Sequence, residues 1–413
     1  MSFDELKLSE ADIEIIDGDR GVNYPKQNEF YDIGYCLFLN AKNVTKDGFD
    51  FNEKSFISRE KDNLLRKGKL VRNDIVLTTR GTVGNVAFYN NRVPFNNIRI
   101  NSGMVILRAK QSEYLPEFVY WMFRSNYIQD QINALKTGSA QPQLPITIMR
   151  TIKVLKPKLC EQKVIAATLS ALDDMIELNN QINKTLEEMA QAIFKSWFVD
   201  FEPFRDGEFE ESEIGPIPKG WRVAALDEIA TYLNGLAMQK YPPSKNERGL
   251  PVLKIKELRQ GFTDGNSDIC SESIDNSYII NDGDIIFSWS GSLLVDIWCG
   301  GRCGLNQHLF KVTSASYNKW FYYMWTRYHL ERFIAIAKDK ATTMGHIQRK
   351  HLSEAKVLIP EPNTLAFMDS VMQPIIDLVI ANKVENKTLS TIRDTLLPKL
   401  MSGEIRVPVE EVV

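Results

Sequence analysis

The chain repeats itself at a shift of 203 residues, and this internal duplication constrains the fold more than any other feature. The tetrapeptide NKTL occurs at 183–186 and again at 386–389. At the same shift, TIKVLKP at 151–157 lies on EAKVLIP at 354–360. A repeat of about half the chain is too long for a solenoid, so the sequence predicts two similar modules.

Each module is followed by a long segment with helical periodicity, at 161–198 and at 364–401. Apolar residues recur at steps of three and four, which is typical of a coiled-coil seam. Asparagines interrupt both seams at matching positions: Asn179, Asn183, Asn382 and Asn386. A helix of ~57 Å cannot bury its apolar stripe alone, so we expect the two helices to pack side by side and antiparallel. The asparagines either pair and set the register or lie exposed at the middle of each helix.

Within each module, short strands alternate with Gly, Asn and Asp, and one aromatic-rich helix follows at 117–135 and at 318–337. This pattern favours an α+β fold: two similar domains of small sheets with helices, joined by two long antiparallel spacer helices in a pseudo-twofold tandem duplication. The predicted boundaries are 1–157 for the first domain, 158–200 for the first spacer helix, 201–220 for an acidic Pro/Gly linker, 221–360 for the second domain, 361–405 for the second spacer helix and 406–413 for a tail.

Charge alternates along the chain although the total is only −3. Both modules are mildly basic, at +4 for 1–157 and +3 for 221–360, while the helical segments are acidic. This distribution suits two surfaces that meet phosphate, separated by connectors that do not. No run approaches 18 apolar residues, the N-terminus is unlike a signal peptide, and the cysteine number is odd, so we expect a cytoplasmic protein without a membrane span.

Catalytic signatures are absent from the sequence. We find no phosphate-binding GxxxxGK[ST] loop, no HExxH zinc helix and no Asn-Pro-Pro-aromatic tetrapeptide of an adenine methyltransferase. Cys299, Cys303 and His308, with Cys270 as a fourth ligand, are the best candidates for zinc. Because the first module contains nothing equivalent, we predict neither a metal site nor a catalytic residue.

Three segments resemble the specificity subunit of type I restriction–modification systems. They are EQKVIAATLSALDDMIELNNQINKTLEEMAQAIFKSWFVDFEPF, GPIPKGW and LLPKLMSGEIRV. The order of domain, helix, domain and helix is similar over nearly the whole chain, although no GxIPxGW motif precedes the first module. The resemblance implies a non-catalytic, sequence-specific DNA-binding subunit that binds two methyltransferase subunits along its helices. It also implies that endonuclease/translocase subunits are recruited, and that S-adenosylmethionine, ATP and Mg are held by the partners.

Two other function classes stay open from the residues alone. One is a self-contained DNA-modifying enzyme, which tight S-adenosylmethionine binding by the isolated chain would support. The other is a coiled-coil scaffold that binds no DNA. If the chain reads DNA, its two unlike modules predict an asymmetric target of two blocks separated by a gap. Half-sites on one face of B-DNA lie about 34–36 Å apart, which a helix of ~57 Å can span.

For base contacts we select the turn after the DIVL and DIIF strands and a downstream loop in each module. Arg80 can make a bidentate contact to guanine, and glutamine can pair with adenine. The candidate base contacts are Thr78, Thr79, Arg80, Gly81, Ser139, Gln141, Gln143, Ser288, Trp289, Ser290, Thr343 and His346. The candidate phosphate contacts are Lys42, Arg99, Lys254, Lys256 and Arg259. Ordinary polar turns are the alternative for all of them.

The aromatic stretches YWMF at 120–123 and WFYYMW at 320–325 can be read as base-stacking platforms or as core. Their helical spacing in both modules favours core. On the first long helix, Phe194, Trp197 and Phe198 are either internal packing or a dock for a methyltransferase subunit, and we select them as partner-binding residues.

Overall fold

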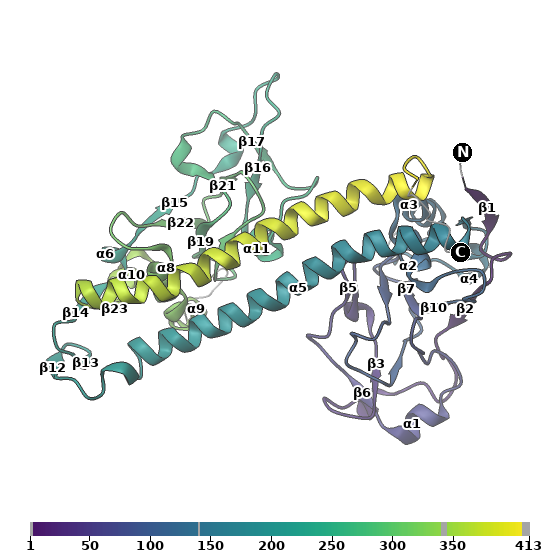
Figure 1. Cartoon of the computed structure of the whole chain (residues 1–413), viewed down its shortest axis with the longest axis horizontal. Coiled ribbons are helices and arrows are strands. Elements are labelled where there is room, and N and C mark those ends of the chain that lie inside the picture. The colour runs from purple at the N-terminus through teal and green to yellow at the C-terminus, as the bar shows by residue number, and fades with distance from the viewer. Residues whose placement is uncertain (1–2, 139–140, 340–344, 407–413) are drawn as a thin grey trace. The chain divides into compact units, whose positions relative to one another are not determined.

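The computed structural model describes residues 3–138, 141–339 and 345–406 (Figure 1). The chain forms two compact units. Unit 1 comprises 1–174 and 390–413, and unit 2 comprises 175–389. Each unit therefore contains one module and a part of both long helices.

Unit 1 is built on a four-stranded antiparallel sheet in the order β2-β10-β7-β8. Its strands are β2 (Ile13–Asp17), β10 (Met104–Ala109), β7 (Ile75–Thr78) and β8 (Val86–Phe88). A three-stranded sheet, β6-β3-β9, contains a parallel pair between β3 and β9, and β1 pairs with β11. These strands are β1 (Asp4–Lys7), β3 (Cys36–Phe38), β6 (Phe56–Ile57), β9 (Ile98–Arg99) and β11 (Lys153–Lys156), beside a small hairpin of β4 (Val44–Thr45) and β5 (Gly48–Phe49).

Unit 2 repeats the main strand pairings of this topology, although its smaller sheet, β17-β16-β21-β18, has a fourth strand. The four-stranded sheet runs β15-β22-β19-β20, β16 is parallel to β21, and β14 pairs with β23. The strands are β14 (Arg222–Ala225), β15 (Thr231–Asn234), β16 (Leu250–Leu253), β17 (Ile269–Cys270), β18 (Ile279–Ile280), β19 (Asp284–Ser288), β20 (Leu294–Trp298), β21 (Cys303–Leu305), β22 (Leu309–Thr313) and β23 (Lys356–Ile359). The duplication inferred from the sequence is therefore a duplication of the fold.

The aromatic-rich segments form two short helices in each unit, where the sequence predicted one. In unit 1, α2 and α3 meet at Ser125, whose hydroxyl donates to the carbonyl of Met122 at 2.6 Å. The corresponding break in unit 2 lies at His329. The shorter helices are α1 (Arg59–Leu64), α2 (Pro116–Arg124), α3 (Asn126–Leu135), α4 (Ile146–Met149), α6 (Leu226–Ile229), α7 (Ile255–Gln260), α8 (Lys319–Tyr328), α9 (Leu330–Asp339) and α10 (Arg349–Ser353).

The aromatic stretches belong to the hydrophobic cores, as their spacing predicted. Trp121 and Phe123 are fully buried in unit 1, as are Trp320 and Phe321 in unit 2. Burying an aromatic side chain of this size removes 150–250 Å² of surface from water. These helices therefore hold the sheets rather than offering platforms for bases.

The two long helices are α5 (Leu159–Phe198), with 40 residues, and α11 (Pro362–Ser402), with 41. Within unit 2 they run antiparallel and are joined by buried amides. Asn179 Nδ2 donates to Asn386 Oδ1 at 3.0 Å, and Asn382 Nδ2 donates to Asn183 Oδ1 at 2.9 Å. Because buried amides without partners are costly, these pairs fix the helix register. Of the two readings of the asparagines, the paired one is confirmed.

The acidic segment 201–220 contains a hairpin that its composition did not reveal. Strands β12 (Phe209–Ser212) and β13 (Gly215–Pro218) pair antiparallel, and Trp221 follows them into the core of unit 2. Phe204 lies edge-on to Trp221 with ring centroids 5.0 Å apart. The segment is thus a packed β-hairpin rather than a linker without structure.

Among the described residues, only α11 is long and apolar enough to cross a membrane, judged by length and composition. One such helix is weak evidence for a span. Met368, Met372 and Ile376 on this helix are buried in the core of unit 2. The apolar stripe of α11 therefore serves packing within the unit.

Candidate nucleic-acid interface

In unit 1 the two loops selected from the sequence lie side by side. Arg80 forms a β-bridge with Gln143, and the amide of Gly81 donates to the carbonyl of Pro142 at 3.1 Å. The amide of Leu144 donates to the carbonyl of Thr79 at 2.9 Å. Gly81 has a φ of +73°, a conformation that L side chains rarely adopt, so glycine is needed in this turn. The two candidates therefore form one surface.

Unit 2 builds the same pairing with different side chains. Ser290 forms a β-bridge with His346, and the amide of Gly291 donates to the carbonyl of Gly345 at 2.9 Å. Gly291 has a φ of +67° and corresponds to Gly81. A common backbone frame thus presents two different sets of side chains.

Not every selected side chain reaches the surface in unit 1. Arg80, Gly81, Gln141 and Gln143 are exposed, and Arg80 has no ion pair among the described residues. Thr78 and Thr79 are buried and are corrected to structural residues. The Thr78 hydroxyl bonds to the carbonyl of Thr82 and accepts from the amide of Asn85, so it holds the turn. Ser139 lies outside the described residues.

In unit 2 the corresponding serines are also structural. Ser288 and Ser290 are buried, and Ser290 Oγ lies 3.0 Å from His308 Nδ1. Trp289 is half-buried, stacks on Phe310, and donates from Nε1 to Asn234 Oδ1 at 2.9 Å. His346 is exposed, whereas Thr343 lies outside the described residues. The serines are corrected, and Trp289 and His346 remain candidates.

Sequence reasoning missed the backbone segment that supports each turn. The amides of Thr79 and Arg80 donate to the carbonyl of Gly103 at 2.8 and 3.2 Å, and the amide of Trp289 donates to the carbonyl of His308 at 3.4 Å. In unit 1 this segment follows β9, and in unit 2 it follows β21. A glycine backbone also lies close against this segment in each unit.

Two glycines permit that approach. A Cβ on Gly18 would lie 2.2 Å from the carbonyl oxygen of Asn101, and one on Gly235 would lie 2.3 Å from that of Asn306. Both glycines end a strand, in the sequences IIDG and YLNG. The repeated Asp/Asn-Gly pair was the signal that could have located this segment.

The predicted phosphate contacts separate into exposed and buried residues. Lys256 and Arg259 are exposed on α7. Lys42 is exposed but forms an ion pair with Glu53 at 2.8 Å. Lys254 forms an ion pair with Asp268.

Arg99 is a correction, because its side chain is only 7% exposed. It donates to Asp62 Oδ1 at 2.5 Å and to the backbone carbonyls of Asp62, Leu65 and Lys67.

Sequence reasoning passed over Lys67 and its neighbour Arg66, both exposed and without an ion pair among the described residues. Gly68, next to them, accepts from the amide of Ile100 at 2.9 Å. Arg66 and Lys67 therefore lie beside the supporting segment of unit 1.

Phe194, Trp197 and Phe198 are corrected from partner-binding residues to core residues. All three are buried in unit 2. Phe198 lies 5.2 Å from Trp325 and 5.5 Å from Trp221, measured between ring centroids. Side chains held in this way are not available to a partner.

A different face of α5 is open. Met175, Leu178, Ile182 and Met189 are 45%, 56%, 37% and 48% exposed. Steps of three, four and seven residues place them on one side of the helix. We call these four residues the α5 stripe. The sequence did not reveal this face, because the apolar residues of the coiled-coil seam lie next to it on the same helix.

Ion pairs fasten each module to the long helices. In unit 1, Asp173 on α5 accepts from Arg124 of α2 at 3.2 Å and from Arg393 of α11 at 2.5 Å. In unit 2, Glu187 on α5 lies 3.6 Å from Arg327 of α8 and 3.7 Å from Lys383 of α11. Burial lowers the pKa of Lys383, but Asp296 and Glu187 outweigh burial and raise it above its ordinary value. Lys383 therefore stays charged in this network of ion pairs in unit 2.

Nothing in the described residues forms a candidate metal site with three or more His, Cys, Asp or Glu side chains. Cys270, Cys299 and Cys303 are all buried. Burial raises the pKa of Cys299 to about 11 and raises the pKa of Cys303 further, which disfavours the thiolate that zinc requires. The surface built by the paired loops exposes arginine and amide side chains in unit 1 and an imidazole in unit 2.

Comparisons with known proteins agree with this architecture. The model of the type I restriction modification DNA specificity domain matches the chain twice, at residues 14–188 and 218–392. The MjaIX specificity subunit of Methanocaldococcus jannaschii is 31% identical over 86% of this chain and 84% of its own length. The HindI specificity subunit of Haemophilus influenzae is 21% identical over 94% and 98%. The crystal structure of the S subunit from M. genitalium has the same fold, with a TM-score of 0.58 at 16% identity over 97% and 96% of the two chains.

The two matched domains define a DNA-recognition protein with duplicated specificity domains. The chain belongs to the type I restriction–modification specificity family, and it is the specificity subunit of such a system. It is the recognition component, while catalysis belongs to partner subunits.

Proposed function

We propose that the two paired-loop surfaces read two different half-sites of one asymmetric, bipartite DNA target. The observation that carries this proposal is the common backbone frame. It pairs Arg80 with Gln143 in unit 1, but in unit 2 it pairs Ser290 with His346 and places Trp289 next to that pair. Identical frames favour the same mode of approach to DNA, and unlike side chains favour different bases.

The long helices support a gap between the half-sites. Helices of 40 and 41 residues, at about 1.5 Å per residue, exceed the 34–36 Å between successive half-sites on one face of B-DNA. The fixed helix register given by the asparagine pairs favours a gap of one length. We therefore expect two short specific blocks separated by a constant number of unread base pairs.

We further propose that two adenine methyltransferase subunits and the endonuclease/translocase subunits assemble on this chain. The α5 stripe supports a methyltransferase dock, since exposed apolar rows are otherwise unfavourable on a helix surface. In this scheme S-adenosylmethionine, ATP and Mg are bound by those partners. The chain itself contributes the choice of DNA sequence.

The test is to co-express the chain with the methyltransferase subunit of the same genome and to map methylated adenines by long-read sequencing. We expect one asymmetric motif with two specific blocks and a constant gap. If a complex forms and no motif appears, the recognition proposal fails and a scaffold role is favoured.

Replacing Arg80 by alanine is expected to relax the first block of the motif and leave the second unchanged. A bidentate arginine–guanine contact contributes about 1–3 kcal/mol of discrimination, or roughly 5- to 150-fold at one base pair. The readout is the methylation frequency at each motif position. Arg150→Ala is a matched control, because Arg150 is also exposed and without an ion pair among the described residues. Relaxation of both blocks, or of neither, would contradict the assignment of Arg80.

A further inference from the structure

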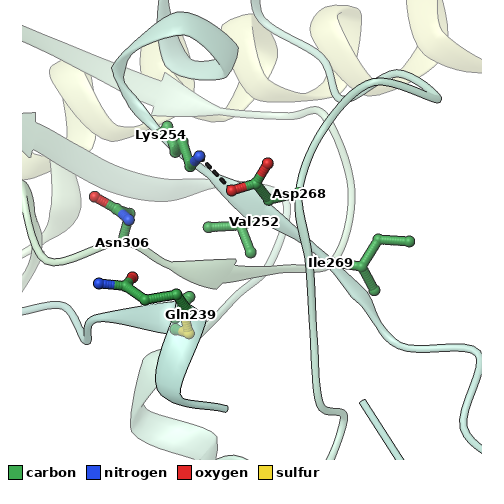
Figure 2. Close-up of a pocket in the computed structure, with 7 residues that line it drawn as sticks. Gln239, Val252, Lys254, Asp268, Ile269 and Asn306 are labelled. Atoms are coloured by element: carbon green, nitrogen blue, oxygen red, sulfur yellow. Dashed lines mark hydrogen bonds and ion pairs between the residues drawn. The ribbon is translucent and has the colours of Figure 1, made fainter. Parts of the chain in front are cut away.

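Unit 2 contains a small polar cleft, and Lys254 is the one predicted contact among its lining residues (Figure 2). Its volume is about 220 Å³. The lining residues are Met238, Gln239, Val252, Lys254, Asp268, Ile269 and Asn306. They come from four segments: the one after β15, β16 with Lys254 directly after it, β17 with Asp268 directly before it, and the segment after β21.

The cleft is continuous with the recognition turn of unit 2. Asn306 belongs to the supporting segment, and its Oδ1 accepts from the amide of His308 at 3.2 Å. The carbonyl of His308 in turn accepts from the amide of Trp289. On the other side, Asn234 holds the Trp289 indole and precedes Gly235, whose backbone lies against Asn306. DNA bound at the turn would therefore have the cleft beside it.

Two amide side chains face this cleft with free hydrogen-bonding groups. Gln239 is exposed, and its amide bonds to no other atom of the described residues. Asn306 uses its oxygen for His308, while its Nδ2 donates to none of them. Both side chains lie on the same side of the cleft in Figure 2. An amide that both donates and accepts matches the N6 and N7 edge of adenine.

An ion pair lies at the other side of the cleft. Lys254 Nζ bonds to Asp268 Oδ2, and the two side chains are 42% and 64% exposed (Figure 2). An exposed pair of this kind is weak and exchanges its partner readily. Lys254 precedes α7, whose surface carries Lys256 and Arg259. Three cationic side chains therefore lie within residues 254–259, and such a cluster suits a DNA backbone.

We propose that this cleft receives one nucleotide of the second half-site, with an adenine edge on the Gln239 amide and the adjoining phosphate on Lys254 in place of Asp268. Asn306 is a positioning residue that connects the cleft to the turn. The proposal rests on the proposed function, and it adds a specificity-determining role for Asp268. That carboxylate is a built-in competitor of the phosphate.

The competition sharpens discrimination between sequences. Any DNA that enters must displace Asp268 from Lys254 and then lies near an uncompensated carboxylate. Cognate DNA offsets this loss through the base contact at Gln239, whereas non-cognate DNA has nothing to offset it. Specificity is a difference of affinities, and a repulsive element against the wrong partner increases that difference.

The experiment uses the full chain in complex with its methyltransferase subunit and compares the variants Gln239→Ala, Asp268→Asn and Lys254→Met. Cognate and scrambled duplexes are titrated at several salt concentrations, and the methylation motif is mapped for each variant. Glu208→Gln is the matched control. It removes the same charge from an exposed ion pair, with Lys219, in the hairpin of the same unit and outside the cleft.

Gln239→Ala is expected to lose about tenfold discrimination at one adenine of the second block and none in the first block. Asp268→Asn should tighten binding of scrambled DNA more than that of cognate DNA. Lys254→Met should lower the slope of log affinity against log salt by about 1. The inference is overturned if Gln239→Ala leaves the second block unchanged, or if Asp268→Asn and Glu208→Gln behave alike. A wild-type complex without any motif would instead overturn the proposed function.

Discussion

Replacement of Arg99 by methionine is expected to destabilise unit 1 by about 3–5 kcal/mol, the range for breaking a buried ion pair by removing one partner. The guanidinium satisfies Asp62 and three backbone carbonyls between residues 62 and 67. Burial raises the pKa of the Asp62 carboxyl, but hydrogen bonds from Lys69 and Arg99 outweigh burial and keep the pKa below its ordinary value. The variant therefore leaves a buried carboxylate with Lys69 as its one remaining cationic partner.

Urea unfolding of the full chain measures the loss, and hydrogen exchange locates it at α1 and the loop that follows. Lys67→Met is the matched control, because Lys67 is exposed in the same loop and surface substitutions usually change stability by less than about 0.5 kcal/mol. If Arg99 instead contacted a DNA phosphate, the Arg99→Met variant would show the opposite pattern. Loss of that contact would lower the salt slope of DNA binding by about 0.9 and leave stability unchanged. That result would restore the role that the sequence suggested for Arg99.

The architecture was predictable because the duplication supplies two copies of each signal. The period of 3.6 residues located both long helices. The matching asparagines left two readings open, and the structure shows the paired one. Aromatic residues at helical spacing predicted core for the same reason. The ends of the individual helices and strands were harder to predict. Ser125 and His329 split what periodicity presents as single helices, and the hairpin after Phe204 has the composition of a linker.

The candidate site was predictable as a set of loops but not as a set of side chains. Turn residues in both modules identified the paired loops, whose proximity is a tertiary contact that no local pattern contains. Thr78 and Ser290 have the chemistry of a base contact, yet their hydroxyl groups are used within the turn. Arg99 was misjudged because charge predicts exposure only on average, and a buried carboxylate reversed it. The cleft has residues from four separate segments and could not be found from sequence.

The helix surface illustrates the same limit for partner binding. Large aromatic residues are frequent at interfaces, which favoured Phe194 and its neighbours, but those rings fill the core of unit 2. The apolar side chains left exposed on α5 include the four of the α5 stripe, and α11 exposes Phe367, Leu378 and Ile392. At the shift of 203, Leu178 and Ile182 correspond to Ala381 and Glu385 on α11. Met175 and Met189 correspond to Leu378 and Ile392, which are also exposed, so the duplicated helices differ at the two middle positions, where α5 is the more apolar.

The double variant Leu178→Glu with Ile182→Glu is expected to remove one methyltransferase subunit from the complex. The two side chains are 56% and 37% exposed, so the glutamates point to water in the free chain and disturb its fold little. In a docked complex each would bury an unpaired charge where an apolar contact was. Central interface residues contribute about 2 kcal/mol or more each, so the pair weakens binding roughly a thousandfold.

Native mass spectrometry of the purified complex counts the methyltransferase subunits, with two expected for the wild type and one for the variant. Lys184→Glu, on the far side of the same helix, adds an acidic group without touching the stripe and should leave the count at two. If the double variant still carries two subunits, the dock lies elsewhere. If it carries none, the two subunits bind cooperatively. The double variant leaves Ala381 and Glu385 on α11 unchanged, so the second subunit would be lost only because the first is absent.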